Sequence, residues 1–247
     1  MKTLDLIKEV RLKLDDEVAP RLFGDDDILR ALNVAEREFA LRTFCIFAGE
    51  REAQVKAQSP WVTLPEGTLW VTGAWIDDNP PLRIVTQHTL ELGYFEADGE
   101  EAATRYSNWR QAVGVPSFLV SDLGPNTVRL VARPQKAGTL FIEGYRLPTA
   151  ALAATEASVP EIPEAYHTDL VLGALAYLLD VPEEENYNPS MAAKKRGEWE
   201  RQLQVAMQLL QTATRVHTKV VPPPPGTLFV GAVGNMIGAA PNDNTET

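Results

Sequence analysis

The sequence contains very few of the residues that form disulfides or transition-metal sites. It has one cysteine and three histidines among 247 residues. A single cysteine excludes a disulfide within the chain, and His88, His167 and His217 are too scattered for zinc, whose ligands come in close spacing. Cys45 lies in the apolar run Phe-Cys-Ile-Phe, and we interpret it as a small buried residue rather than a nucleophile. We therefore expect neither a metal nor a cofactor.

The sequence also lacks the glycine-rich and serine motifs of common enzymes. It has no G-x-x-x-x-G-K-[ST] loop, no G-x-G-x-x-G after a strand and no G-x-S-x-G elbow. His167 is the best lone candidate for proton transfer, but it lies near a helix start at an exposed or interfacial position, where a structural or contact role is favoured. The acidic runs at residues 25–27 and 183–185 do not alternate as calcium loops do, and we interpret them as a helix cap and a solvated connection.

These absences predict that the chain is not an enzyme. Two carboxylates that meet only in space leave no sequence pattern, however. An enzyme that uses such a pair, for example on glycans, stays open as an alternative.

Acidic residues outnumber basic residues, and no long apolar run is present. The formal net charge is -11, which disfavours sequence-specific binding of nucleic acid, although the charge can equally serve solubility alone. No run approaches the roughly 20 apolar residues of a membrane-spanning helix, so we expect no contact with a membrane. The first residues are interrupted by charges and do not form a signal peptide.

Apolar spacing predicts helices at both ends of the chain. One helix covers residues 3–18 and ends at Pro20, and a second runs from about residue 28 to Phe47, which the charged residues 50–56 can extend. A third begins at Pro163 and ends near residue 181. A longer one follows, with its apolar residues at spacings of four and three, which are Trp199, Leu203, Ala206, Leu210 and Ala213.

The middle of the chain has the composition of β-strands. Strands rich in β-branched and aromatic residues alternate with turn residues, at residues 61–64, 68–72, 82–86, 118–120, 127–131 and 139–145. Their partial alternation of apolar and polar residues is typical of antiparallel sheets. Residues 88–94 can start a short helix, and residues 149–158 are interpreted as a linker.

The predicted fold class is α+β. We expect a helical bundle built from an N-terminal αα-hairpin and a C-terminal long helix pair, with an inserted antiparallel β-rich segment and an extended C-terminal arm. The predicted divisions are a helical hairpin at 1–57, a β-rich insertion at 58–150, a helix pair at 160–216 that packs with 1–57, and a Pro/Gly-rich arm at 217–247.

Two segments are candidates for contact with a partner. Lys194, Lys195 and Arg196 form the only concentrated basic stretch, which suits an acidic partner or another copy, or else is an ordinary solvated face. In the tail, four prolines form a stiff spacer, and Phe229 and Val230 follow in a strand-like apolar run. This run can add to a neighbour's sheet edge or lie in a groove, or it is a disordered terminus.

The layout resembles the head-to-tail adaptor (connector) proteins of tailed bacteriophages. The resemblance rests on residues 10–16 with 25–35, on the β segment at 139–148, and on residues 162–179 with the helix that carries Trp199. Together these stretches cover most of residues 1–215, and the tail from Pro222 onward is not matched.

The resemblance implies a structural virion protein that sits as a ring between portal and tail and forms part of the DNA exit channel. Implied partners are the portal protein, tail or nozzle proteins, and further copies in a cyclic oligomer, expected to be a dodecamer. Genomic DNA would pass through without sequence-specific contact. The implied location is the neck of the virion, after assembly in the host bacterial cytoplasm. A tail, baseplate or tail-completion component is the alternative within the same class.

Overall fold

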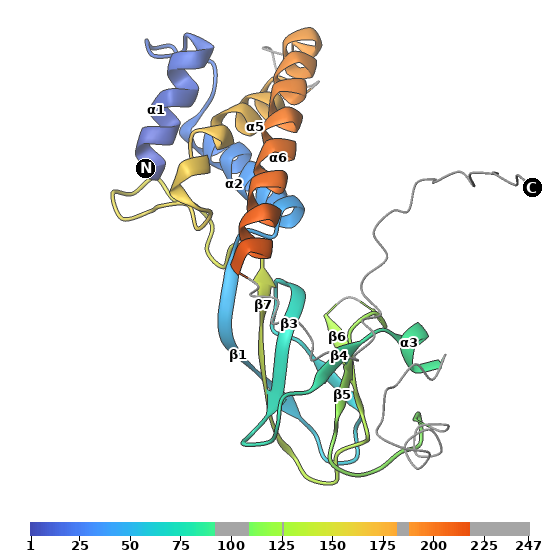
Figure 1. The fold of residues 1–247 in the computed structure, drawn as a ribbon. Coiled ribbons are helices and arrows are strands. Elements are labelled where there is room, and N and C mark those ends of the chain that lie inside the picture. The colour runs from blue at the N-terminus through green and yellow to red at the C-terminus, as the bar shows by residue number, and fades with distance from the viewer. Residues whose placement is uncertain (92–108, 125, 182–187, 218–247) are drawn as a thin grey trace, which may run out of the picture.

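Two main hydrophobic cores organise the chain into a helical part and a β part. The computed structural model describes residues 1–91, 109–124, 126–181 and 188–217. Figure 1 shows the helical part at one end of an elongated molecule and the β part at the other. The helical part contains α1 (Thr3–Leu14), α2 (Asp25–Thr43), the short 3-10 helix η1 (Glu164–Tyr166), α5 (Asp169–Leu178) and α6 (Pro189–His217). The β part contains β1 (Phe47–Val55), β2 (Trp61–Thr63), β3 (Thr68–Ile76), β4 (Arg83–Val85), α3 (Gln87–Glu91), β5 (Phe118–Val120), β6 (Thr127–Val131) and β7 (Gly138–Arg146).

Helix α2 begins and ends where its own residues dictate. The carboxylate of Asp27 accepts a hydrogen bond from the N–H of Gly24 at 3.3 Å, and Asp25 and Asp26 complete an acidic first turn that suits the positive end of the helix dipole. The helix ends at Phe44, whose left-handed backbone (φ 51°) turns the chain toward β1.

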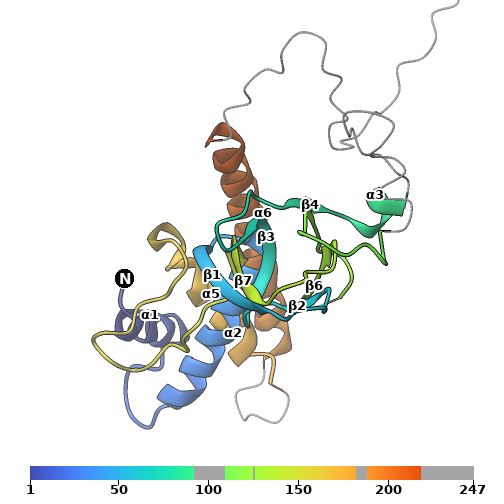
Figure 2. The ribbon, with the colours of Figure 1, turned by 90° about the horizontal axis from the view of Figure 1, so that it is seen from below.

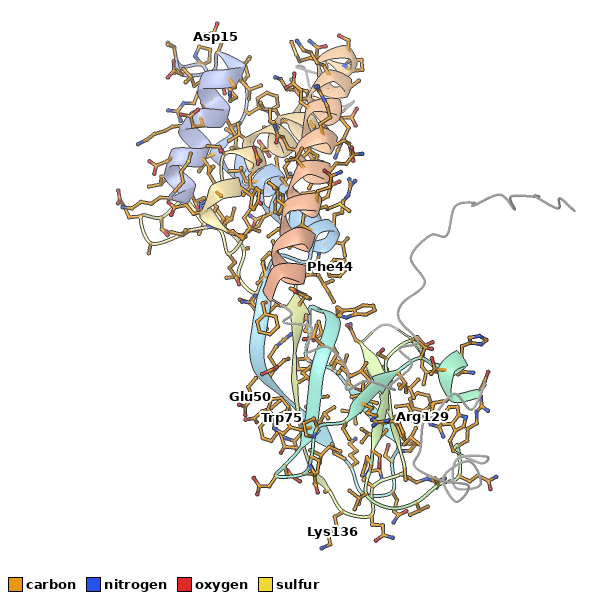
Figure 3. All side chains as sticks on the ribbon, in the orientation of Figure 1. Asp15, Phe44, Glu50, Trp75, Arg129 and Lys136 are labelled. Atoms are coloured by element: carbon orange, nitrogen blue, oxygen red, sulfur yellow. The ribbon has the colours of Figure 1, made fainter. Side chains whose placement is uncertain are left out.

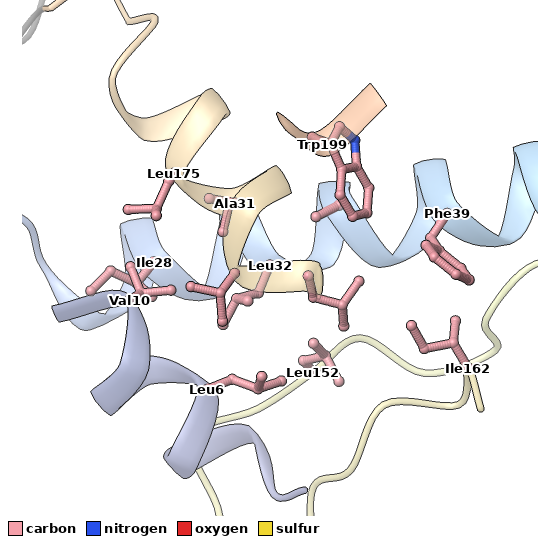
Figure 4. Packing of buried hydrophobic residues seen from close by; sticks show 14 of the residues in the cluster. Leu6, Val10, Ile28, Ala31, Leu32, Phe39, Leu152, Ile162, Leu175 and Trp199 are labelled. Atoms are coloured by element: carbon pink, nitrogen blue, oxygen red, sulfur yellow. The ribbon is translucent and has the colours of Figure 1, made fainter. Parts of the chain in front are cut away.

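The core of the helical part is built around Trp199 of α6. Trp199 is fully buried and lies against Phe39 of α2, with ring centroids 6.0 Å apart (Figure 4). Helix α5 packs against both α2 and α6. Gly173 allows this close approach, because a Cβ there would lie 2.8 Å from the Cβ of Ala35 and 3.1 Å from the ring of Trp199.

The β part consists of two sheets that face each other across a second core. A 3-stranded sheet has the order β1-β7-β3, and a 4-stranded sheet has the order β2-β6-β5-β4. Strand β1 also contacts β2 and β3 contacts β4, so the sheets meet at both margins, and Figure 2 shows them as opposite walls. The inward residues form the core, which consists of Ala53, Val55, Val62, Val71, Ala74, Ile76, Leu82, Leu119, Val128, Leu130, Leu140 and Ile142.

The segment between β7 and η1 is fastened to the helical part. The amide side chain of Asn33 on α2 accepts from the N–H of Leu152 at 2.7 Å and donates to its carbonyl at 3.3 Å. The N–H of Thr3 donates to the carbonyl of Ser158 at 2.9 Å, and the Leu152 side chain enters the helical core. The residues interpreted as a linker therefore pack across α1 and α2.

The predicted α+β class is confirmed, but the predicted extension of the second helix through residues 50–56 is wrong. These residues belong to β1, which pairs with β7 and buries Ala53 and Val55. Two further differences are that the third helix starts at Asp169 after a 3-10 turn, and that β4 pairs in parallel with β5 within the otherwise antiparallel sheets. The short helix expected at residues 88–94 is α3, and residues 92–94 lie outside the described part.

Candidate interaction surfaces

The basic stretch predicted to contact a partner lies on α6 and is partly engaged within the chain. Lys194 is exposed, whereas the Nζ of Lys195 lies 2.9 Å from a carboxylate oxygen of Glu198. The guanidinium of Arg196 donates to Glu38 at 3.1 Å and stacks 4.6 Å from the ring centre of Tyr177. Phe229 and Val230 lie outside the described residues. Partner contact by these five residues stays a prediction.

Glu38 joins three helices through a network that the sequence analysis did not identify. One carboxylate oxygen of Glu38 accepts hydrogen bonds from the hydroxyl of Tyr177 at 3.2 Å, from Arg196 at 3.1 Å and from the indole N–H of Trp199 at 3.1 Å. Its other oxygen lies 3.4 Å from the guanidinium of Arg42, one helical turn away. The sequence contained one indication of this network, because the indole N–H of a buried tryptophan such as Trp199 requires a hydrogen-bond acceptor.

A buried ion pair fixes the connection between α1 and α2. The guanidinium of Arg11 donates to Asp16 at 2.7 Å and to the carbonyl of Phe23 at 3.1 Å, and it also contacts Asp25. Asp16 in turn accepts from the N–H of Leu22 at 2.6 Å. The acidic run at residues 25–27 thus has a structural role, and no group of metal-ligating side chains was found among the described residues.

His167 is buried, so the exposed or interfacial position expected for it is wrong. It is 3% exposed, and its Nε2 lies 2.9 Å from the carbonyl oxygen of Ile162. Its Nδ1 lies 3.1 Å from the terminal amine of Met1. These contacts hold the N-terminus against the turn before α5, which is a structural role.

A cleft of about 880 Å³ separates α2 from the β part. Glu36 and Glu66 are its acidic lining residues, but Glu36 is only 1% exposed and accepts the N–H of Glu161 at 2.6 Å. Burial raises the pKa of Glu36 to about 7, against the opposing effect of its backbone hydrogen bonds. Glu36 is therefore an internal acceptor that joins α2 to the segment after β7.

The outer side of the 3-stranded sheet carries aromatic and acidic residues, and we call it the acidic face. Its members alternate along the strands with the core residues, and they are Glu52, Gln54, Trp70, Trp75, Thr139, Phe141, Glu143 and Tyr145. Phe141 and Trp75 are stacked with centroids 5.8 Å apart, and the exposed Phe47 lies 5.7 Å from Tyr145. Trp70 is 58% exposed.

The outer side of the 4-stranded sheet packs against α3 and Trp109 through a small apolar cluster of Leu90, Trp109, Phe118, Val120 and Val131. Arg110, Arg129 and Arg133 lie near one another beside this cluster and Arg83 is exposed on β4, and we call this side the arginine face. The guanidinium of Arg129 lies 5.2 Å from the ring centre of Trp61 and 4.9 Å from that of Trp109, and Arg110 lies 4.5 Å from the same Trp109 ring. Burial and the neighbouring charges of Arg110 and Arg133 lower the pKa of Arg129. The Nε atoms of Arg129 and Arg133 are buried without a hydrogen-bond acceptor in the described part of the chain.

The acidic and arginine faces lie on opposite sides of the β part. Figure 3 shows this through Trp75 of the 3-stranded sheet and Arg129 of the 4-stranded sheet, which point away from each other. Sequence reasoning missed both faces, because they depend on which strands pair. Arg129, for example, meets Trp61 only through the register of β2 on β6.

The fold and these surfaces belong to a structural protein of a phage particle, as the comparison with known families shows. A family model described as "SU10 adaptor protein" matches residues 1–223. The chain belongs to the SU10 adaptor protein family, which is a family of phage head–tail adaptors. No curated protein matches the sequence. In the described part of the chain, none of the helices combines the length and apolar content that a membrane crossing needs.

Proposed function

We propose that copies of this chain form a closed ring that joins the portal to the tail and surrounds part of the DNA exit channel. The observation that carries the proposal is the family match, which extends through both parts of the molecule to residue 223. The partners are the portal protein, tail or nozzle proteins, and further copies of the chain, with a dodecamer as the expected ring. Assembly takes place in the host cytoplasm before the particle is complete.

The charge of the chain is consistent with a channel that does not retain DNA. A net charge of -11 gives the ring wall a negative potential, which does not hold passing phosphates. The helical part, held together by the Trp199 core and the Glu38 network, serves as the rigid body of the ring. The β part faces a neighbour or the tail side.

The C-terminal residues are proposed to reach the portal or an adjacent copy. Helix α6 ends at His217, and in the sequence four prolines at residues 222–225 stand between it and the apolar Phe229 and Val230. A chain that lacks residues 222–247 should lose attachment to the portal in a pull-down with purified portal. Unchanged attachment would show that this segment does not contact the portal.

The first test of the proposed function is the copy number of the chain in purified virions, measured by quantitative mass spectrometry against the major capsid protein. About twelve copies per particle are expected for one closed ring at the tail vertex. Absence from the particle would overturn the proposal. Cross-linking to the tail tube rather than to the portal would assign the chain to a tail or tail-completion role instead.

A further inference from the structure

Among the described residues, the β part has two outer surfaces of opposite charge, although α3 and Trp109 cover the apolar centre of the arginine face. The acidic face contributes Glu52 and Glu143, and none of its outward residues is basic. No helix of the described chain packs extensively on β1, β7 or β3. On the opposite side, Glu91 pairs with Arg110, while Arg83 is exposed. Counted over the described residues, the arginine face thus carries an excess of positive charge on a chain that is acidic overall.

We infer that the acidic face of one copy docks on the arginine face of the next copy. The inference rests on the proposed ring and specifies which surfaces close it. Guanidinium groups recognise carboxylates through paired N–H donors, so Glu52 and Glu143 are suitable partners for this face.

Aromatic side chains on both faces provide the apolar area that the charges alone lack. Trp70 is 58% exposed and Phe47 55% exposed beside the acidic face, and Trp61 is 46% exposed beside Arg129. Tryptophan and arginine are enriched at the centres of protein interfaces, where rigid aromatic rings bury much area at low entropic cost. Charge complementarity orients the contact, and these rings supply contact area.

The position of the two faces fits a ring. In a cyclic assembly each subunit uses two different surfaces, one for each neighbour, and those surfaces must lie on roughly opposite sides of the subunit. Trp75 and Arg129 mark opposite sides of the β part (Figure 3). A contact between identical faces would bring carboxylates against carboxylates or arginines against arginines, which disfavours an isolated dimer.

A second copy explains the arginine face better than nucleic acid does. Single strands bind through free aromatic ring faces, but Trp109 is only 6% exposed and is already contacted by Arg110 and Arg129. The net charge of -11 also opposes a polyanion.

The test is a reciprocal charge reversal in the phage that carries this gene, with the gene deleted and supplied from plasmids. The first variant is Glu52→Arg with Glu143→Arg, and the second is Arg83→Glu with Arg110→Glu, which leaves Arg129 in place between its tryptophans. In either variant alone, like charges meet between neighbours, whereas in a mixture a ring in which the two variants alternate joins opposite charges at every contact. Adaptor copies per particle are measured by quantitative mass spectrometry.

Each variant alone is expected to lower the adaptor copies per particle at least about tenfold, and co-expression of both is expected to restore them. A control matched in charge to the first variant, Glu17→Arg with Asp180→Arg on exposed residues of the helical part, should assemble like the unchanged chain. Circular dichroism checks that every variant is folded.

Three results would overturn the inference. One is that either variant alone is incorporated into particles at the level of the unchanged chain. This is also the result expected if the arginine face contacts DNA instead of a neighbouring copy. The second is that co-expression of the two folded variants does not restore the adaptor copies per particle. The third is that the control lowers the adaptor copies per particle as much as the variants do. If the unchanged chain itself is missing from particles, the proposed function and this inference fall together. If it is present and only the mixture fails, the inference alone falls.

Discussion

The helical part and the β part use charged residues in opposite ways. In the helical part, Glu38 and Arg11 are turned inward, where they bind donors and acceptors from several segments. In the β part, the glutamates of one sheet and the arginines of the other lie on the sides of the sheets that face away from the apolar core between them. The difference indicates that charged residues join the segments of the helical part, whereas in the β part they lie mainly outside the apolar core, which is where the proposed contact with a neighbour would use them.

Removal of the central tryptophan should produce the largest loss of stability. Trp199→Ala leaves a cavity among α2, α5 and α6 and is expected to lower the free energy of unfolding by about 4 kcal/mol. Urea denaturation monitored by circular dichroism measures the change. A loss below about 1 kcal/mol would contradict the view that Trp199 is the centre of this core.

The pH dependence of the free energy of unfolding should show the effect of the raised pKa of Glu36. Because its pKa of about 7 in the folded protein exceeds the ordinary value of 4.5, the folded protein keeps a proton that the unfolded chain releases between these pH values. The stabilisation is complete below pH 4.5, declines as the pH rises, and is lost above pH 7, a change of up to about 3 kcal/mol. Denaturation of the wild type and of Glu36→Gln from pH 5 to pH 8 gives the difference curve. Parallel curves for the two proteins would rule out this role of Glu36.

Loss of the Glu38 carboxylate should have a smaller effect. Glu38→Ala leaves the guanidinium of Arg196 and the indole N–H of Trp199 without their common acceptor, at an expected cost of about 2 kcal/mol. Glu38→Gln keeps an acceptor and should lose less. Equal losses for the two variants in the same denaturation assay would show that the charge, not the hydrogen bonding, is what matters.

An exposed tryptophan of the β part should matter least for folding. Trp70→Ala removes a ring that is 58% exposed, and the free energy of unfolding should change by about 0.5 kcal/mol or less. The same substitution should reduce incorporation into particles if Trp70 contributes to the contact between copies. A large loss of stability instead would show that Trp70 packs like an internal side chain, and it would contradict the assignment of Trp70 to an outer face of the β part.

Local patterns predicted the helical part better than the β part. The spacing of Trp199, Leu203 and Ala206 identified the buried side of α6, because helical periodicity is a local property. Strand β1 was misassigned because its partner, β7, lies roughly 90 residues further along the chain and only that pairing makes it a strand. The arginine face likewise depends on long-range register, and the position of Glu36 beside Glu161 depends on how the segment after β7 folds back on α2.

The junction between the two parts has a mechanical consequence. The chain passes from α2 into β1 and returns through β7, and these strands are hydrogen-bonded to each other from Phe47 opposite Tyr145 onward. Figure 1 shows both strands running along the length of the molecule. Because β1 enters and β7 leaves at the same end of this antiparallel pair, a pull that separates the two parts acts on both strands in the same direction, and the load is divided between two chain segments instead of one. The paired strands also resist torsion, since twisting one part against the other would have to wind two coupled strands rather than rotate a single peptide segment.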